Sequence, residues 1–245
     1  MVLSGQHQCQ WEKVEVGVFA GPDVSESGLV LALDAGNTKS YSGSGTTWTD
    51  LSGRGNNGTL TNGPTYSSSN GGSIVFDGTN DYVDCGIVNL SSGTSLTLEV
   101  WVKPGVTQYA YADILDYDHG GGGGGGFVIQ QNNLATNQYY FAYWNGTSYD
   151  VTSTTLNLGT SSFNHLAFTK SGTSVLGYLN SQNTVNYTGS SVIGLSGRTL
   201  HIGRFVVGTG REFNGNIASV KIYNRALTAA EIQQNFNANR GRFGI

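Results

Sequence analysis

The sequence predicts an all-β fold: an antiparallel sandwich of two sheets with one short helix at its C-terminal end. Short apolar runs separated by turn residues recur along the 245 residues of the chain, and this spacing is typical of many strands joined by tight loops. Hydrophobic residues make up 38% of the chain and aromatic residues 11%, enough to fill a core between two sheets. The C-terminal stretch, in contrast, carries the signals of a helix.

Residues 1–27 differ from the rest of the chain and are interpreted as an attachment arm in front of a main domain of residues 28–245. Alternating valines after Trp11 predict one strand, which Gly21 and Pro22 end. A single strand ahead of a domain pairs either with that domain's own sheet or with the edge of a partner's sheet, and both alternatives stay open. The residues expected to contact a partner are Trp11, Val14, Val16 and Val18.

The main domain is expected to begin with a buried strand at 28–34, followed by a glycine-rich loop region at 37–63. Residues 95–102 form the longest alternating strand. One face carries Leu96, Leu98, Val100 and Val102, and the other carries Thr97, Glu99 and Trp101. Further strands are expected at 73–78, 81–85, 127–130, 139–144, 164–170, 174–179, 200–203 and 217–223.

The C-terminal helix is predicted from its first turn. Thr228 and Glu231 form a T-x-x-E capping box, in which the Thr hydroxyl accepts an N–H of the helix and the Glu carboxylate accepts the Thr amide. Ile232 and Phe236 lie four residues apart and share one face of the helix. The helix is therefore expected to pack back onto the strands.

Seven consecutive glycines, Gly120 to Gly126, are expected to form a mobile loop, because ordering a glycine costs much entropy. Neither a Lys-Ser/Thr pair nor a helix pattern follows them, so the run is not a phosphate-binding loop. Its role stays open. An acidic patch precedes and enters the run and is interpreted as a solvated loop; it consists of Asp113, Asp116, Asp118 and His119.

Charge, hydropathy and cysteine content limit the possible partners and the possible disulfide bonds. The formal net charge is −4, and the 12 Lys and Arg residues are scattered, which argues against nucleic-acid binding. No run of 18 apolar residues exists, so no membrane insertion is expected, and residues 1–10 lack the apolar segment of a secretory signal. Cys9 and Cys85 are interpreted as two free thiols, although pairing between them stays open.

Five segments occur in an order and spacing that resemble laminin-G-like domains of the concanavalin A-like superfamily. They are SIVFDGTNDYVDCG (73–86), SLTLEVWVKP (95–104), SFNHLAFTKSG (162–172), LHIGR (200–204) and FNGNIASVKIYNRALTAAEIQQNF (213–236). Residues 28–60 are similar to the entry segment of the same group. The resemblance covers residues 28–245 and implies a jelly-roll sandwich.

The closing stretch YNRALTAAEIQQNFNANRGRFGI is similar to the ends of such domains in virion proteins of tailed bacteriophages. This resemblance implies a structural protein located in the virion, a capsid decoration or a tail or fibre component, attached through its N-terminal arm. Its expected partners are other virion proteins and further copies of itself, as a homo-oligomer. Capsid and tail placement remain alternatives.

The superfamily also contains glycoside hydrolases, which need two carboxylates at the scissile bond. Its sandwich glucanases carry these as E-x-D-x-x-E on one strand, and no such pattern occurs here. Glu99 is followed by Val100, Trp101, Val102 and Lys103 and has no acidic neighbour on its strand. The chain is therefore expected not to be an enzyme.

The resemblance also implies a candidate calcium site. Asp77 stands where the family often binds Ca²⁺, and Asp81 and Asp34 are further candidate oxygen ligands. The family often has an acidic pair after its G-x-I segment, but here those positions are Ala218 and Ser219. The alternative is that Asp77 caps a turn by accepting backbone N–H groups.

A lectin-like adhesin that binds host-surface glycans is the alternative function. Sugars stack on exposed aromatic rings and need polar side chains for hydrogen bonds. Since strands alternate, about half of the aromatic residues in the relevant segments should face the core instead. The glycan-binding candidates are Tyr109, Tyr111, Tyr117, Tyr143, Trp144 and Tyr149.

Overall fold

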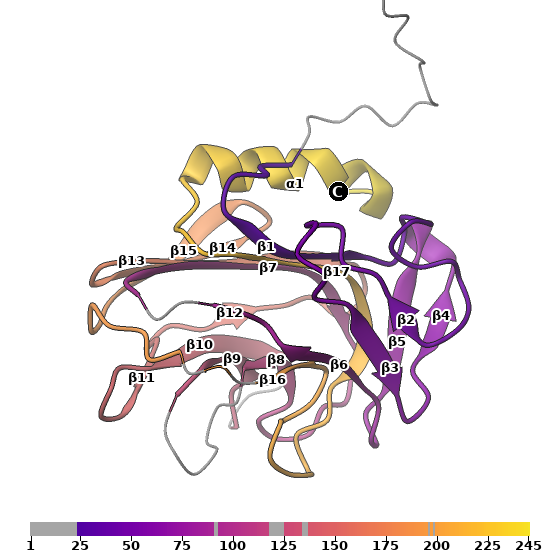
Figure 1. Cartoon of the computed structure of the whole chain (residues 1–245), viewed down its shortest axis with the longest axis horizontal. Coiled ribbons are helices and arrows are strands. Elements are labelled where there is room, and N and C mark those ends of the chain that lie inside the picture. The colour runs from indigo at the N-terminus through magenta and orange to yellow at the C-terminus, as the bar shows by residue number, and fades with distance from the viewer. Residues whose placement is uncertain (1–23, 91–92, 118–124, 134–136, 196, 198) are drawn as a thin grey trace, which may run out of the picture.

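The computed structural model describes residues 24–90, 93–117, 125–133, 137–195, 197 and 199–245. Two antiparallel sheets face each other across one core, and a single α-helix of the described part, α1 (Ala229–Phe243), lies on the outer side of one sheet (Figure 1). This arrangement confirms the predicted all-β sandwich with a C-terminal helix. The sheet beneath α1 is called the helix-side sheet, and the other the opposite sheet.

The helix-side sheet has eight strands in the order β15-β14-β13-β7-β17-β5-β4, with β1 also paired to β17. Their bounds are β1 (Leu29–Asp34), β4 (Thr65–Ser67), β5 (Ser73–Asp77), β7 (Ser95–Pro104), β13 (Asn164–Ser171), β14 (Ser174–Leu179), β15 (Gln182–Thr188) and β17 (Asn214–Tyr223). A short 3₁₀ helix, η1 (Ser69–Gly71), joins β4 to β5.

The opposite sheet has nine strands in the order β11-β10-β9-β8-β16-β6-β3-β2, with β12 also paired to β10. Their bounds are β2 (Thr47–Trp48), β3 (Gly58–Thr61), β6 (Tyr82–Ile87), β8 (Asp113–Tyr117), β9 (Phe127–Gln131), β10 (Gln138–Trp144), β11 (Tyr149–Val151), β12 (Leu156–Asn157) and β16 (Thr199–Ile202).

Strand β7 has the two faces that its alternation predicts, and both are buried. Its four aliphatic residues belong to the core between the sheets. Its other face lies under α1, where Thr97 accepts the Leu227 N–H at 2.8 Å and Glu99 accepts the side-chain amide of Asn235 at 2.6 Å. The helix therefore covers a second, partly polar layer on the outer side of the sandwich.

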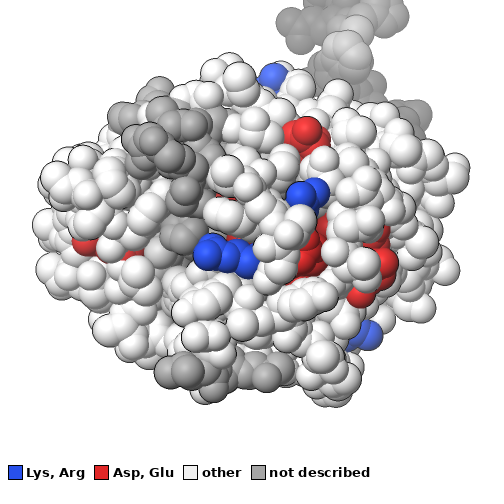
Figure 2. Space-filling view, turned by 90° about the horizontal axis from the view of Figure 1, so that it is seen from below, with Lys and Arg blue, Asp and Glu red and all other residues white. Residues whose placement is uncertain are grey.

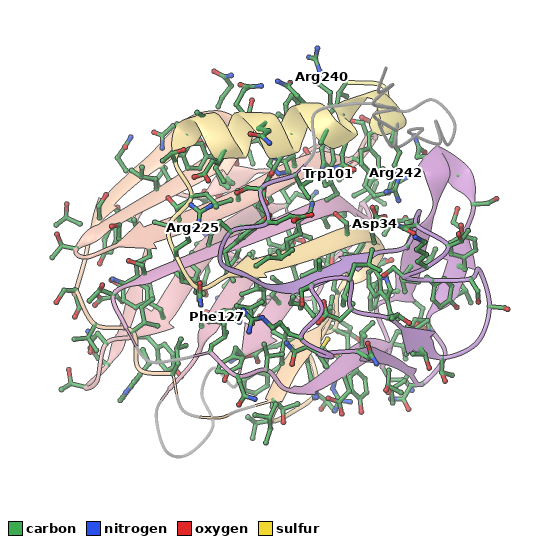
Figure 3. All side chains as sticks on the ribbon, turned by 45° about the horizontal axis from the view of Figure 1, so that its top comes forward. Asp34, Trp101, Phe127, Arg225, Arg240 and Arg242 are labelled. Carbon is green, nitrogen blue, oxygen red and sulfur yellow. The ribbon has the colours of Figure 1, made fainter. Side chains whose placement is uncertain are left out.

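Helix α1 begins at the predicted capping box, with Thr228 as N-cap and Glu231 completing the reciprocal bond. Its C-terminal end is held twice. The Phe243 ring stacks on Trp101 with centroids 4.2 Å apart, and Arg242 reaches Asp34 at 2.6 Å (Figure 3). Both contacts join the helix to strands far away in the sequence.

The described chain starts beside α1. The Ser25 N–H donates to Asn235 Oδ1 at 2.8 Å, and Arg225 donates to the Ser25 hydroxyl at 2.9 Å. No helix within the described ranges is long and apolar enough to cross a membrane. Cys85 is a buried free thiol. Outside the described residues lie Cys9, Trp11, Val14, Val16, Val18, Asp118, His119 and glycines 120–124.

Candidate functional site

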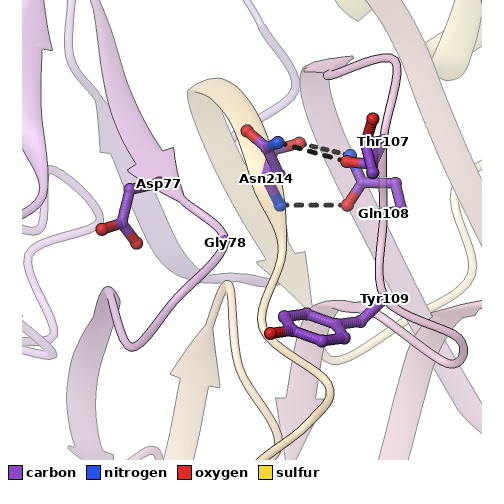
Figure 4. A pocket seen from close by; sticks show the side chains of 6 residues that line it. All are labelled: Asp77, Gly78, Thr107, Gln108, Tyr109 and Asn214. Atoms are coloured by element: carbon purple, nitrogen blue, oxygen red, sulfur yellow. Dashed lines mark hydrogen bonds between the residues drawn. The ribbon is translucent and has the colours of Figure 1, made fainter.

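A hollow opens at the rim of the sandwich, where β5 ends, β17 begins and the chain leaves β7. Its volume is about 340 Å³. The hollow lies at the end of β5, whereas Arg242 of α1 binds the Gly72 carbonyl just before the start of that strand. Its lining residues come from three segments: Asp77 and Gly78, Thr107 to Tyr109, and Asn214 (Figure 4).

Hydrogen bonds of Gln108 and Asn214 fix the wall of this rim hollow. Gln108 Oε1 accepts the Asn214 N–H at 3.0 Å, and its Nε2 donates to the Asn214 carbonyl and, at 3.3 Å, to the Gly105 carbonyl. Asn214 Nδ2 in turn donates to the Thr107 carbonyl at 3.1 Å. The wall is thus a small network of side-chain amides bound to backbone groups.

The floor of the hollow depends on the pairing of β5 with β17. Asp77 lies opposite Asn214 in this ladder. Gly78 follows with φ of 75°, and a Cβ on it would come within 2.8 Å of Asn214 Cβ. A larger residue there would be strained and would push into the wall, so glycine is required for this turn.

Tyr109 is the aromatic side chain of the hollow, and 51% of its surface is exposed. Its backbone carbonyl accepts the Ala112 N–H at 3.1 Å and Gln131 Nε2 at 3.0 Å. The backbone is therefore anchored while the ring stays accessible. Tyr111, 37% exposed, lies two residues on and packs under the Arg211 guanidinium at 5.4 Å.

Asp77 and Asp81 come together, as expected, but as turn formers. The Asp77 N–H donates to Asp81 Oδ2 at 3.0 Å, and the Thr79 N–H donates to Asp77 Oδ1 at 2.7 Å. Burial is the main cause that raises the pKa of Asp81. These contacts support the alternative in which Asp77 caps a turn.

The third calcium candidate lies elsewhere. Asp34 is paired with Arg242 and accepts the Gly36 N–H at 2.8 Å. Within the described residues, no group of three or more His, Cys, Asp or Glu side chains is placed to hold a metal ion. The donor set therefore does not fit a calcium site built from Asp34, Asp77 and Asp81, because one of the three carboxylates already binds a guanidinium.

The six glycan candidates divide by burial. Tyr109 and Tyr111 are exposed, whereas Trp144 and Tyr149 are half-buried and pack edge to face at the β10–β11 hairpin. Tyr117 and Tyr143 are fully buried, and their hydroxyls bind the Val88 and Ser190 carbonyls. For these two residues the prediction of a sugar contact is wrong, because both rings fill the core between the sheets.

The prediction of a solvated acidic loop is also wrong for Asp113 and Asp116, which are fully buried in β8. Gln130 donates to Asp113 at 2.6 Å, and the Val206 N–H donates to Asp116 at 3.0 Å. Burial, followed by the neighbouring Asp116, raises the pKa of Asp113 well above its ordinary value.

Sequence reasoning missed most of the hollow. Thr107 and Gln108 lie in a loop and Asn214 at a strand start, and they meet because β7, which precedes the loop, pairs with β17 in one register. The Asp-Gly turn at 77–78 was the one local signal of this site. The partner of that turn is 137 residues further along the chain, and nothing local indicates it.

The family model described as the concanavalin A-like lectin/glucanases superfamily, of laminin G type, matches residues 77–233. A comparison with curated protein sequences finds no match.

Several solved structures share the fold. Domain 4 of an extracellular arabinanase from Geobacillus stearothermophilus, in complex with arabinotriose, is 18% identical with a TM-score of 0.69, over 87% of this chain and 100% of that one. The binding domain of botulinum neurotoxin DC, in complex with SialylT, is 13% identical with a TM-score of 0.63, over 87% of this chain and 52% of that one.

Trypanosoma rangeli sialidase is 16% identical with a TM-score of 0.63, over 89% of this chain and 34% of that one. The chain thus corresponds to a whole arabinanase domain, but to about a third of the sialidase and half of the toxin fragment. At these identities the likeness concerns the fold alone. Since the family model matches more than half of its residues, the chain belongs to the concanavalin A-like lectin/glucanases superfamily.

Proposed function

We propose that the chain is a non-enzymatic, lectin-like module that binds a carbohydrate in the rim hollow. The observation that carries this proposal is the half-exposed Tyr109 ring, held at the edge of a hollow whose other lining groups are polar. Sugars bind proteins by stacking their apolar C–H face on an aromatic ring while polar groups bind their hydroxyls. The hollow offers both features together.

The volume of the hollow and the ligands of similar solved structures support the proposal. A hollow of about 340 Å³ lies near the lower end of the usual range for ligand sites, which is roughly 300–1,000 Å³. It would suit one sugar unit, with the rest of a chain outside. The solved arabinanase domain with arabinotriose and the toxin domain with SialylT make carbohydrate the ligand class to test first.

A glycan array probed with the protein and with Tyr109→Ala tests the proposal. Loss of the stacking ring should weaken binding at least tenfold, which corresponds to about 1.4 kcal/mol. Ile87→Ala is the matched control, because Ile87 is also exposed, at 59%, but lies on β6 outside the hollow. An array with no bound glycan, or binding that survives Tyr109→Ala, would contradict the proposal.

The virion role is a second part of the proposal. It rests on the resemblance of the closing stretch to phage virion proteins, and one contact favours it: Ser25 is held beside α1, and neither lines the rim hollow. An arm that attaches the domain there would leave the hollow free, as in a capsid decoration, tail or fibre component that displays an adhesin to host-surface glycans.

Deleting residues 1–27 and measuring incorporation into particles tests this attachment. Incorporation should fall to background, while the protein that lacks residues 1–27 still binds glycan. Unchanged incorporation would refute the role of the arm.

Light scattering of the purified protein checks the proposed homo-oligomer. Incubation with β-glucans and arabinan checks the expected lack of enzymatic turnover.

A further inference from the structure

Three of the four side-chain amide N–H groups of the rim hollow are bound to backbone carbonyls. Gln108 Nε2 donates to the Gly105 and Asn214 carbonyls, and Asn214 Nδ2 donates to the Thr107 carbonyl. The hollow's lining holds no lysine, arginine or histidine. A ligand entering it therefore meets no cationic side chain, and a single side-chain amide N–H, on Asn214 Nδ2, remains for an acceptor.

The acceptors, in contrast, remain available. Asp77 Oδ1 takes one backbone N–H, and within the described part of the chain neither its second oxygen nor Asn214 Oδ1 has a hydrogen-bond partner. The hydroxyls of Thr107 and Tyr109 can donate or accept, so they do not discriminate between ligands. The side chains of the hollow therefore offer a ligand more hydrogen-bond acceptors than donors.

The charge of the lining residues also disfavours an anionic ligand. Asp77 is exposed and is the charged residue among the lining residues, and Asp81 lies directly behind it at 3.0 Å from the Asp77 backbone. The nearby guanidinium of Arg211 lies between the Phe205 and Tyr111 rings, at 4.4 and 5.4 Å from their centroids, and does not line the hollow. An anionic group in the hollow would face a carboxylate with no compensating cation.

We infer that the rim hollow selects a neutral, hydroxyl-rich sugar unit and rejects units that carry a carboxylate or sulfate. This inference rests on the proposed function. Two neighbouring hydroxyls of the sugar donate to Asp77 Oδ2 and Asn214 Oδ1, and Tyr109 supports the ring. Hydrogen bonds to a carboxylate are stronger than those between neutral groups, so Asp77 both strengthens hydroxyl binding and repels anions.

Matched glycan pairs test the selectivity. Oligosaccharides of glucose and galactose are compared with the corresponding oligoglucuronates and oligogalacturonates, which differ only in the carboxylate at C6. We expect each bound neutral glycan to bind at least tenfold more tightly than its acidic partner. Asp77→Asn keeps an oxygen for the Thr79 N–H and removes the charge, so the difference should shrink to threefold or less.

Glu26→Gln is the control, since it removes one exposed negative charge at the start of the described chain, outside the hollow. It should leave the tenfold difference unchanged. Acidic glycans that bind as tightly as their neutral partners, and lose binding in Tyr109→Ala, would overturn the inference while the proposed function stands. Absence of binding to every glycan would overturn the proposed function and the inference with it.

Discussion

At the scale of single residues, Asp113 shows how backbone geometry determines whether a carboxyl group is buried. A register shift in β8 between Asp113 and Leu115 changes the alternation of the strand. Asp113 and Asp116 are both buried, and the segment after β16 covers them with the Val206 N–H and the Arg211 carbonyl. Figure 2 shows the molecule from below, where most of the surface is uncharged and the acidic and basic side chains gather near the middle and right of the view.

The Asp113 carboxyl should make stability depend on pH. Burial, with a further contribution from Asp116, raises its pKa in the folded state. The folded state then holds the proton more tightly than the unfolded state, so stability falls as pH rises from near 3.8 through the raised value. Asp113→Asn should flatten this dependence and raise Tm at neutral pH by at least ~2 °C, the shift expected from about 1 kcal/mol.

Thermal unfolding of both proteins between pH 4 and pH 8 measures this effect. The two Tm curves should converge in acid and separate as the pH rises. Parallel curves, or a steeper fall in Asp113→Asn, would show that Asp113 does not carry the dependence. Glu26→Gln provides the reference for the loss of an exposed carboxylate.

The environment of a side chain was predictable only where its contacts are close in sequence. The sequence indicated that about half of the clustered aromatic residues would be buried, but not that Tyr117 and Tyr143 would be among them. The facing of a ring depends on bulges and on loops that cover a strand, and neither is visible in alternation. Asp77 could be placed in a turn, because its partners at Thr79 and Asp81 are close in sequence.

At the scale of elements, α1 was predicted from its beginning but not from its end. Its capping box lies within four residues, so the pattern is local and the structure confirms it. Its C-terminal contacts, Phe243 on Trp101 and Arg242 on Asp34, join it to β7 and β1. Pairings between segments this far apart in sequence leave no periodic signal.

Removing the cap should have a modest effect. Thr228→Ala eliminates the hydroxyl that accepts the Glu231 N–H, and loss of such a cap typically costs about 1 kcal/mol. Urea unfolding should show this loss, whereas Thr184→Ala, an exposed threonine on β15, should be neutral. Equal effects of the two substitutions would exclude a capping role.

Removing the aromatic anchor should cost more. Phe243 is 5% exposed and packs on Trp101 and Phe163, and truncation of a buried phenylalanine costs about 3–5 kcal/mol. Phe243→Ala should therefore lower the unfolding free energy by roughly this amount, and Phe243→Leu by less, since it fills part of the space. A loss below about 1 kcal/mol would mean that α1 is held mainly by its other contacts.

The edge strand β15 is one element that sequence reasoning missed. Strand β15 is mostly exposed and polar, so it lacks an apolar alternation. It forms because the turn at Asn180 and Ser181, both with positive φ, folds it back on β14. The turn that joins them contains no glycine, so it lacks the asparagine-glycine or aspartate-glycine signal of a two-residue hairpin turn.

At the scale of the whole molecule, we assign attachment and ligand binding to separate parts of the surface. The start of the described chain is tied to α1, whereas the rim hollow is lined by residues of neither segment. Attachment and ligand binding would then not compete for the same surface. The two-sheet plan itself was predictable, because it follows from strand spacing and apolar content.

Calcium removal tests whether the rim depends on a metal. Because Asp34 binds Arg242 and the Asp77–Asp81 turn is held by backbone N–H groups, EDTA should leave Tm and glycan binding unchanged. A Tm that falls in EDTA and recovers with added Ca²⁺ would show instead that Asp77 and Asp81 are metal ligands. Mg²⁺ added in place of Ca²⁺ is the control for ionic strength.

The most direct measurement is a crystal structure of the protein with the tightest neutral glycan from the array. We expect one sugar unit in the rim hollow, with its ring against Tyr109 and two hydroxyls on Asp77 and Asn214. A sugar bound elsewhere, such as at Trp144 and Tyr149 of the β10–β11 hairpin, with the rim hollow filled only by water, would contradict the account.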